Sequence, residues 1–211
     1  MKKDIIILTK SDKRMGYCVA GIDRQTGEWI RVVSSNASTE HAVPGQHLVC
    51  DDGQIVDIYD IVEIDFIRAV PKDVQPENYL YNETVQWRKK GKSDLSEVLH
   101  IHGYDNAGYV FGNTANRLEK SEVHLVGQSL LLLKVERPMY NVKYFPERTV
   151  LQLNFSYKSK SYSFFKVTQK DLKEKYKIEG RYATGTNVFV FSLTDQYIDG
   201  RYYKVVAQAL M

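Results

Sequence analysis

Residues 157–162 carry the clearest chemical pattern in the sequence, because aromatic and basic residues are interleaved there in the run Tyr157-Lys-Ser-Lys-Ser-Tyr162. Aromatic rings can stack on bases while lysines neutralise phosphates, and single-strand binding uses both contacts. The hypothesis is that Tyr157, Lys158, Lys160 and Tyr162 contact single-stranded nucleic acid from a hairpin. The alternative is a hairpin with a purely structural role, and the pattern leaves both open.

A second basic cluster lies in residues 10–16, where a polar turn is expected to follow a first strand. Lys10, Lys13 and Arg14 could neutralise phosphates there, and Ser11 could help to position them through a hydrogen bond. The alternative is a solvated hairpin tip that binds no ligand.

Trp29 and Arg31 stand two residues apart in an expected strand, so their side chains point to the same face. Trp29 could stack on a base while Arg31 contacts a phosphate or stacks as well. The alternative places Trp29 in the core and leaves Arg31 partly covered. Alternation by itself does not show which face of the strand meets water.

The run Gln75-Pro-Glu-Asn-Tyr79 is a polar cluster among apolar neighbours. Glu77 and Asn78 could read base edges, because Asn offers both a donor and an acceptor, and Tyr79 stands beside them as a further contact. The favoured alternative is structural: these groups tie a crossing segment to nearby backbone, because buried polar groups need partners.

Metal and catalytic motifs are missing from the sequence. His100-Ile-His102 could place two ligands on one face of a strand, but no Cys or acidic pair stands at a familiar metal spacing nearby. No P-loop, Gly-x-Ser-x-Gly or Gly-x-Gly-x-x-Gly motif occurs, and the adjacent Asp51 and Asp52 favour a turn over a nuclease centre. We therefore expect no metal, no cofactor and no enzymatic activity.

The composition is that of a folded globular protein with unevenly placed charge. Of 211 residues, 43 % are hydrophobic and 26 % are charged, which allows one large β-domain or two small ones. The net charge is +3, yet residues 141–181 hold ten Lys/Arg against four Asp/Glu, so the remainder of the chain is net negative. A basic half suits a polyanionic partner, and the alternative is chance clustering on a solvated surface.

Two apolar runs, residues 5–8 and 130–133, are strand-sized and too short for a signal sequence or a membrane span. Cys18 and Cys50 each stand among apolar residues, which predicts two buried thiols in a reducing compartment. We therefore expect a cytoplasmic protein that does not bind membranes.

Strand-like runs separated by turns occupy both ends of the chain. Residues 1–70 are predicted to form a small Greek-key barrel from strands at residues 4–10, 17–23, 28–33, 47–56 and 59–67. Residues 71–126 are predicted to be a crossing segment with a short helix at residues 93–100, where Ser93-Asp-Leu-Ser-Glu fits an N-cap.

Residues 127–211 are predicted to form a second barrel with one inserted helix. Its expected strands are residues 129–136, 141–143, 149–157, 160–166, 187–193 and 202–209. The helix is expected at residues 168–176, where Thr168 can cap it and Asp171 suits the positive first turn.

Three separated blocks of sequence, in the right order, resemble the dual OB-containing domain family (DuOB). The opening block is Gly16-Tyr-Cys-Val-Ala-Gly-Ile-Asp, a turn, and Gly27-Glu-Trp-Ile-Arg-Val-Val-Ser34. The middle block is Asp60-Ile-Val-Glu with Gln75-Pro-Glu-Asn-Tyr-Leu and Trp87, and the closing block is Phe189-Val-Phe-Ser-Leu with Tyr203-Lys-Val-Val-Ala. One departure is Met15, because family members tend to have two adjacent glycines at this point.

The resemblance implies a mainly β protein with two OB-like barrels, joined by the crossing segment with one or two short helices. It also implies recognition of nucleic acid, often in prokaryotic defence, without enzymatic activity. In an OB barrel the loop after the first strand lies beside the ligand face, which would place the basic turn of residues 10–14 there. The leading hypothesis is a non-catalytic module that binds single-stranded or structured DNA or RNA. The alternative is a small-ligand or protein-interaction sensor built on the same barrels.

Overall fold

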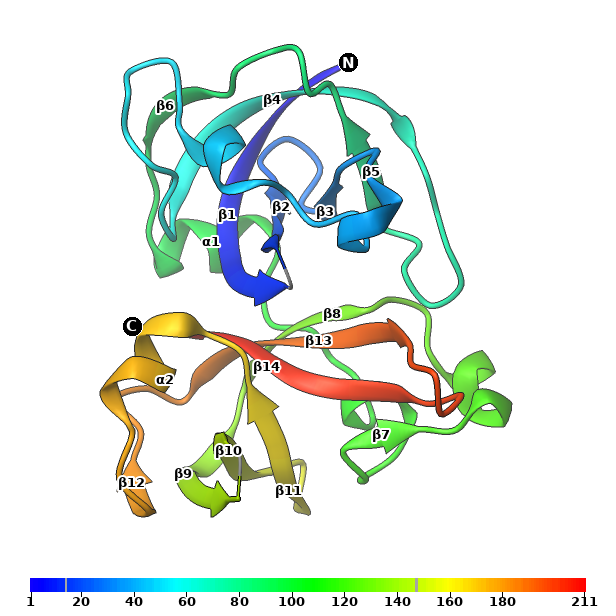
Figure 1. Ribbon diagram of the computed structural model, residues 1–211, viewed down its shortest axis with the longest axis vertical. Coiled ribbons are helices and arrows are strands. Elements are labelled where there is room, and N and C mark those ends of the chain that lie inside the picture. Colours follow the sequence, from blue (N-terminus) through cyan, green and yellow to red (C-terminus); the bar gives the residue numbers. More distant parts are fainter. Residues whose placement is uncertain (14, 147) are drawn as a thin grey trace. The chain divides into compact units, whose positions relative to one another are not determined.

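The computed structural model describes residues 1–13, 15–146 and 148–211, and it is mainly β-structure with a few short helices (Figure 1). It divides into two compact units, Met1–Gly103 and Tyr104–Met211. Residues 71–126 were expected to form a separate crossing segment, but residues 71–103 belong to the first unit and residues 104–126 to the second. No helix in these described ranges has the length and apolar character of a membrane span.

The first unit contains a closed five-stranded barrel. Its strands are β1 (Lys2–Lys13), β2 (Gly16–Asp23), β3 (Trp29–Val33), β4 (Asp60–Ala69) and β5 (Asn78–Tyr81). They pair in the order β1-β2-β3-β5-β4, and β4 pairs back onto β1 to close the barrel. Strands β3 and β5 are parallel, and the other neighbours are antiparallel. A further strand, β6 (Arg88–Lys92), pairs with β4.

Strand β1 is long enough to pair with two neighbours. Residues 2–6 pair with β4, residues 5–13 pair with β2, and the register with β2 shifts between Ile7 and Thr9. Such a bulge increases bending and twist, which suits a strand that closes a barrel. A Cβ atom on Gly21 of β2 would lie 2.0 Å from the carbonyl oxygen of Ile6. Glycine therefore allows β1 and β2 to approach closely.

Alternate side chains of these strands point inward and form the core of the first unit. The buried cluster includes Ile5, Ile7, Val19, Ile30, Val32, Val62, Ile64, Phe66, Tyr81 and Trp87. Burial of each such side chain contributes about 1.5–3 kcal/mol, so this apolar cluster is a main favourable term in the folding of the unit.

The prediction of a strand at residues 47–56 is wrong. The chain there forms a 3-10 helix, Gly45–Leu48, and a turn, with a single bridge between Val49 and Ile55. The fifth barrel strand is β5, which comes from the expected crossing segment. The predicted short helix is confirmed as α1 (Leu95–Ile101), and the Asp94 side chain caps it by accepting a hydrogen bond from the Glu97 amide at 2.9 Å.

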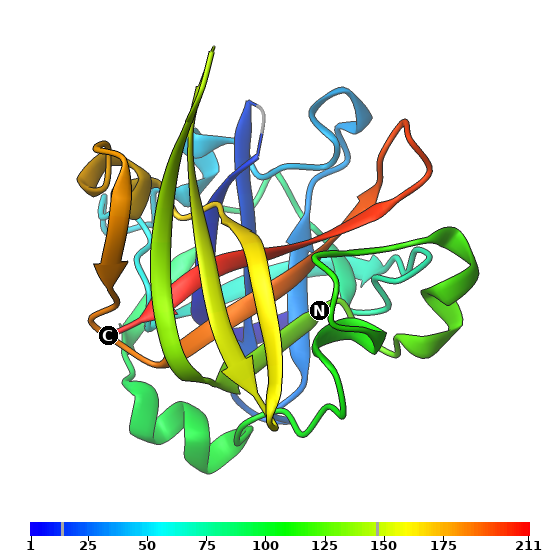
Figure 2. The ribbon, with the colours of Figure 1, turned by 90° about the horizontal axis from the view of Figure 1, so that it is seen from below.

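The second unit contains an eight-stranded sheet. Its strands are β7 (Arg117–Leu118), β8 (Leu130–Lys134), β9 (Glu136–Phe145), β10 (Arg148–Tyr157), β11 (Lys160–Val167), β12 (Gly180–Ala183), β13 (Val188–Gln196) and β14 (Tyr202–Leu210). They pair in the order β12-β9-β10-β11-β14-β13-β8, and β7 pairs with β14. Strands β9, β10 and β11 lie side by side in Figure 2, coloured yellow-green to yellow.

Strands β8 and β9 act as one bent strand that is interrupted at Val135. Strand β8 pairs with β13 and β9 pairs with β10, and the Val135 amide donates to the Asn187 carbonyl at 2.8 Å. If β8 and β9 are counted as one strand, the pairing order is β8/β9-β10-β11-β14-β13, and β13 pairs back onto β8. This order corresponds to β1-β2-β3-β5-β4 of the first barrel. The parallel pair, β11 and β14, also occupies the same place as β3 and β5. The two units thus share a topology although their sequences show no repeat.

The inserted helix of the second unit is confirmed as α2 (Lys170–Lys175), but Thr168 is not its cap. Gln169 occupies the N-cap position, and the Thr168 hydroxyl donates to the Val206 carbonyl at 3.2 Å. The strand expected at residues 141–143 is the much longer β9, and neither β7 nor β12 was predicted. Both are short and polar, so they carry little alternation that a sequence pattern could reveal.

Candidate nucleic-acid interface

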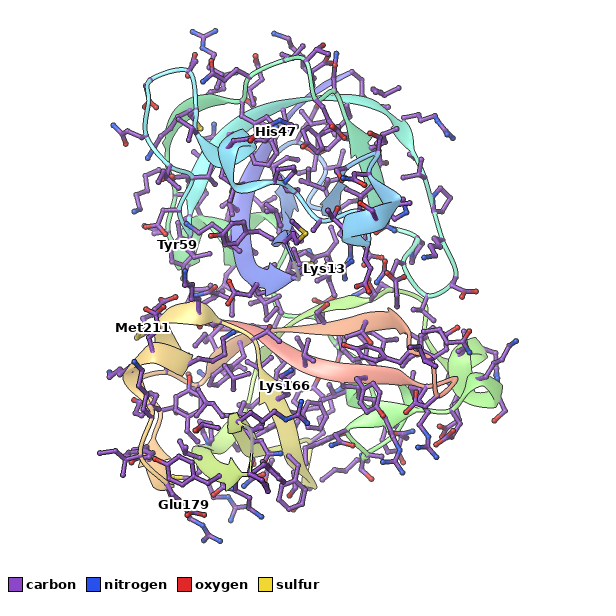
Figure 3. The ribbon with its side chains drawn as sticks, viewed as in Figure 1. Lys13, His47, Tyr59, Lys166, Glu179 and Met211 are labelled. Atoms are coloured by element: carbon purple, nitrogen blue, oxygen red, sulfur yellow. The ribbon has the colours of Figure 1, made fainter. Side chains whose placement is uncertain are left out.

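The basic residues expected in a turn after the first strand lie in β1 itself as far as Lys13, because β1 extends to that residue. Their positive charge is less free than the sequence indicates. The ammonium groups of Lys10 and of Lys13, which is labelled in Figure 3, each donate to a loop carbonyl oxygen at 2.6 Å. Ser11 is buried. Arg14, the fourth predicted contact, lies outside the described residues. Lys10 and Lys13 of β1 therefore hold neighbouring loops in place.

Trp29 and Arg31 are buried, with 6 % and 5 % of their surfaces exposed. The Trp29 ring packs edge-on against His102, with the ring centroids 5.4 Å apart. Arg31 Nη2 lies 3.5 Å from Glu77 Oε1, and Arg31 Nη1 lies 3.0 Å from Cys18 Sγ. Neither side chain is available to stack on a base. Trp29 matches the structural alternative, and Arg31 is buried rather than partly covered.

Glu77, Asn78 and Tyr79 support the parallel pairing of β3 and β5. The Glu77 carbonyl accepts a hydrogen bond from the Arg31 amide at 2.8 Å, and Asn78 Nδ2 donates to Gln75 Oε1 at 3.2 Å. Glu77 and Asn78 are buried, and the half-buried Tyr79 pairs with β3 and β4. These contacts fit the interpretation in which the segment is tied to the barrel.

The tyrosines of the β10–β11 hairpin are core residues. Tyr162 is 1 % exposed and stacks on Phe155, with ring centroids 5.0 Å apart, and Tyr157 is 8 % exposed. Stacking of bases on these two rings is therefore not supported. Lys158 and Lys160 lie near the turn, where Lys158 Nζ donates to an Asn106 side chain and Lys160 Nζ lies 4.7 Å from the centre of the Tyr109 ring.

A larger polar surface extends from the strands of this hairpin, β10 and β11, onto the neighbouring strands β9 and β12. Alternate residues in 151–155 are buried, so the residues between them point outward. Gln152 pairs with Asn141 on one side and with Lys166 on the other, and Asn141 pairs with Arg181. Opposite residues of antiparallel strands point the same way. We define the outer face by Arg137, Met139, Asn141, Lys143, Gln152, Asn154, Ser156, Ser161, Ser163, Phe164, Lys166 and Arg181.

Four cations of the outer face have no carboxylate partner among the described residues. They are Arg137, Lys143, Lys166 and Arg181. Lys143 Nζ lies 5.3 Å from the centre of the Phe164 ring, which is itself 47 % exposed. A cation beside an exposed ring offers charge and a stacking surface at the same place.

The surroundings of Lys166 on this face disfavour its charged form. Lys166, labelled in Figure 3, is exposed on β11, yet desolvation by its neighbours lowers its pKa. The positive charges of Arg148 and Lys173 lower this pKa further. A bound anion would relieve the repulsion and favour the charged form of Lys166.

A pocket of about 380 Å³ opens in this face and is lined by Arg137, Arg181, Met139 and serines of β10 and β11. The backbone around it is irregular, because Arg137 and Phe164 have φ values of 48° and 64° and the β10 register shifts next to Asn154. Bulges redirect side chains, and residues held at positive φ cost about 1–3 kcal/mol each and cluster at functional sites.

The match to a family model covers residues 3–209 and carries the description Dual OB-containing domain. The chain belongs to the dual OB-containing domain family. This match spans both units of the DuOB chain, so each barrel corresponds to one OB fold. Comparison of the chain with curated proteins and with solved structures found no significant match.

Two strands of each barrel correspond to the strands on which OB folds bind their ligands. OB folds bind oligonucleotides and oligosaccharides on strands two and three and on the adjoining loops. In the first barrel these strands are β2 and β3, where residues 19–23 and 29–33 are all buried. In the second barrel they are β10 and β11, which carry the outer face. Strands β10 and β11 of the second barrel therefore place an exposed polar surface at the position that OB folds use for ligands.

Sequence reasoning identified the β10–β11 hairpin of the DuOB chain but missed the arginines and Lys143 beside it. Arg137, Lys143 and Arg181 come together because β9 pairs with β10 on one edge and with β12 on the other. The alternation in residues 151–156 could have indicated this polar face, because the apolar residues at 151, 153 and 155 imply that the polar residues between them point outward. The pairing of β12 with β9 had no comparable signal.

His41, His47 and His102 of the DuOB chain contact neighbouring groups of the fold. In the described ranges, no group of three or more His, Cys, Asp or Glu residues is placed to hold a metal ion. His102 Nδ1 lies 2.7 Å from the Gly27 carbonyl oxygen. Both cysteines are free thiols, and Cys18 is half-buried rather than buried as predicted. Desolvation by burial is the main cause that raises the pKa of Cys50 to about 11. Nearby carboxylates, of which Asp52 has the largest effect, raise this pKa further.

Proposed function

We propose that this chain is a non-catalytic module that binds single-stranded nucleic acid on the outer face of the second barrel. The observation that carries the proposal is the set of four cations that have no carboxylate partner within the described part of the chain, with Lys143 beside the exposed ring of Phe164. Cations neutralise backbone phosphates and provide most of the affinity for a polyanion. The Phe164 ring favours single strands over duplexes in this proposal, because only unpaired bases can stack freely on a side chain.

The composition of the face supports this ligand class in two further ways. Serine hydroxyls and side-chain amides alternate with the cations, and such groups can bond to phosphate, sugar or base edges. Residues 141–181 hold the chain's excess of positive charge, which would steer a polyanion to this unit.

The test is fluorescence anisotropy of labelled single-stranded DNA, single-stranded RNA and duplex oligomers at low salt. We expect saturable binding that is tighter for single strands. The double variant Lys143→Gln/Lys166→Gln should weaken it by about ten-fold, because two phosphate contacts are lost.

The matched control removes two exposed lysines of the same unit that lie outside the face, in Lys120→Gln/Lys134→Gln. This control keeps the net charge equal to that of the double variant and should bind within about two-fold of the original chain. Absence of binding to every oligomer, or equal losses in the two double variants, would contradict the proposal. The change Lys158→Ala/Lys160→Ala should have the smaller effect, because these lysines already contact Asn106 and Tyr109.

A further inference from the structure

The pocket in the outer face owes its positive charge to two arginines, whereas the rest of that face carries lysines. Arg137 from β9 and Arg181 from β12 both line it. Neither guanidinium makes a hydrogen bond or an ion pair with any described residue. A guanidinium presents several donors in a planar fork that fits the oxygens of a phosphate, and two of them on one pocket favour an anion with more than one negative charge.

Hydrogen-bond donors complete the wall of this pocket. Ser156, Ser161 and Ser163 contribute hydroxyl groups that have no hydrogen-bond partner within the described residues. Asn154 also lines the pocket, and its Oδ1 accepts a hydrogen bond from the Phe164 amide at 2.8 Å. That bond uses only the oxygen of the side-chain amide. The Nδ2 group of Asn154 is therefore a further donor. No carboxylate belongs to the described lining of the pocket.

The size and the apolar part of the pocket restrict the ligand further. A volume of about 380 Å³ lies at the small end of the range for small-molecule sites. Met139, on the same wall, gives an apolar surface against which a sugar or a base can pack. The pocket therefore suits one small group that carries a compact anion and an apolar part.

We infer that this pocket holds the terminal phosphate of a nucleotide, bound between Arg137 and Arg181, with the serine hydroxyls as additional donors. This inference rests on the proposed function, of which it names the anchoring group. A terminal phosphomonoester carries about 1.5 to 2 negative charges at neutral pH, more than a phosphodiester inside a strand, so two guanidinium groups discriminate in its favour. The phosphate can belong to the end of a strand or to a free nucleotide.

The experiment compares ligands that differ only in this phosphate. Labelled single strands that end in a 5′-phosphate, a 3′-phosphate or hydroxyl groups are titrated by anisotropy, and a nucleoside 5′-monophosphate and its nucleoside are titrated by calorimetry. We expect at least one phosphorylated ligand to bind about ten-fold more tightly than its hydroxyl counterpart, as one or two charge-assisted hydrogen bonds provide. Arg137→Gln and Arg181→Gln should each remove that preference. Arg68→Gln, at an exposed arginine of the first unit, should keep it.

The outcomes separate this inference from the proposed function. Equal affinity for the phosphorylated and hydroxyl strands, together with no binding of the monophosphate, overturns the inference and leaves the proposed function intact. A preference that survives both arginine variants also overturns it. Binding of the monophosphate alone, lost in the arginine variants, supports the pocket and contradicts strand binding. Absence of binding in every titration overturns both.

Discussion

Lys204 on β14 is a residue whose chemistry depends on its burial. It is 1 % exposed, and its ammonium donates to the Val110 carbonyl at 2.6 Å and to the carbonyl and side-chain oxygens of Asn113 at 2.8 and 2.7 Å. All three acceptors are formally neutral. Burial lowers the pKa of Lys204 to about 7, and the nearby Glu122 offsets only part of this shift.

This depressed pKa predicts a pH dependence of stability. Between pH 7 and the ordinary lysine pKa of about 10.4, the unfolded chain keeps a proton that the folded chain has released, so the free energy of unfolding rises with pH. The rise is at most about 1.4 kcal/mol per pH unit, the value for one proton. Cys50, with its raised pKa, acts in the opposite direction from about pH 9 upward, so the useful window is pH 7 to 9.

Denaturant unfolding from pH 7 to 9 checks this prediction when the original chain is compared with Lys204→Met. The variant should lack the rise, although it is less stable overall because three oxygens lose their donor. An NMR titration of the Lys204 ammonium needs no variant. An ammonium that stays protonated up to pH 10 would show that its three hydrogen bonds compensate for desolvation.

At the scale of elements, the close contact between β1 and β2 depends on one missing side chain. Gly21 lies opposite Ile7, and a Cβ there would meet the Ile6 carbonyl oxygen at 2.0 Å. Gly21→Ala should therefore lower the free energy of unfolding by about 3 kcal/mol, because two paired strands must move apart. Gly108→Ala is the control, since no atom lies within 4 Å of its Cβ position. Similar denaturation midpoints for the two variants would contradict this account.

At the scale of the whole molecule, the charge distribution predicts how binding responds to salt. The net charge is only +3, so attraction of a polyanion depends on the local excess in the second unit. For single strands the slope of log K against log salt is about −0.7 per contacting cation, so the four cations of the outer face give up to about −3. The Lys143→Gln/Lys166→Gln variant should flatten the slope by about 1.4, whereas the Lys120→Gln/Lys134→Gln control should keep it. Salt-independent binding would rule out phosphate contacts as its source.

Most of the β-structure was predictable, because short runs of β-branched, aromatic and other apolar residues are separated by turn residues, and β10 also alternates between inward and outward residues. Strands β1, β2, β4, β10, β11 and β14 lie close to their predicted positions, and both helices were located. Residues 47–56 misled the prediction, since their apolar side chains fill the barrel from a 3-10 helix and a turn. The charged strand β6 and the short strand β12 were invisible, because their place depends on a partner strand and not on their own pattern.

The sequence by itself determined the strand content, the family and the excess of positive charge in residues 141–181, because composition and period-two alternation are local properties. The tertiary structure decided which of these residues meet solvent. It buried Trp29, Arg31, Tyr157 and Tyr162, and it gathered Arg137, Lys143 and Arg181 on one face. The physical reason is that the register between distant strands sets which side of a strand faces the core, and sequence spacing alone does not specify that register.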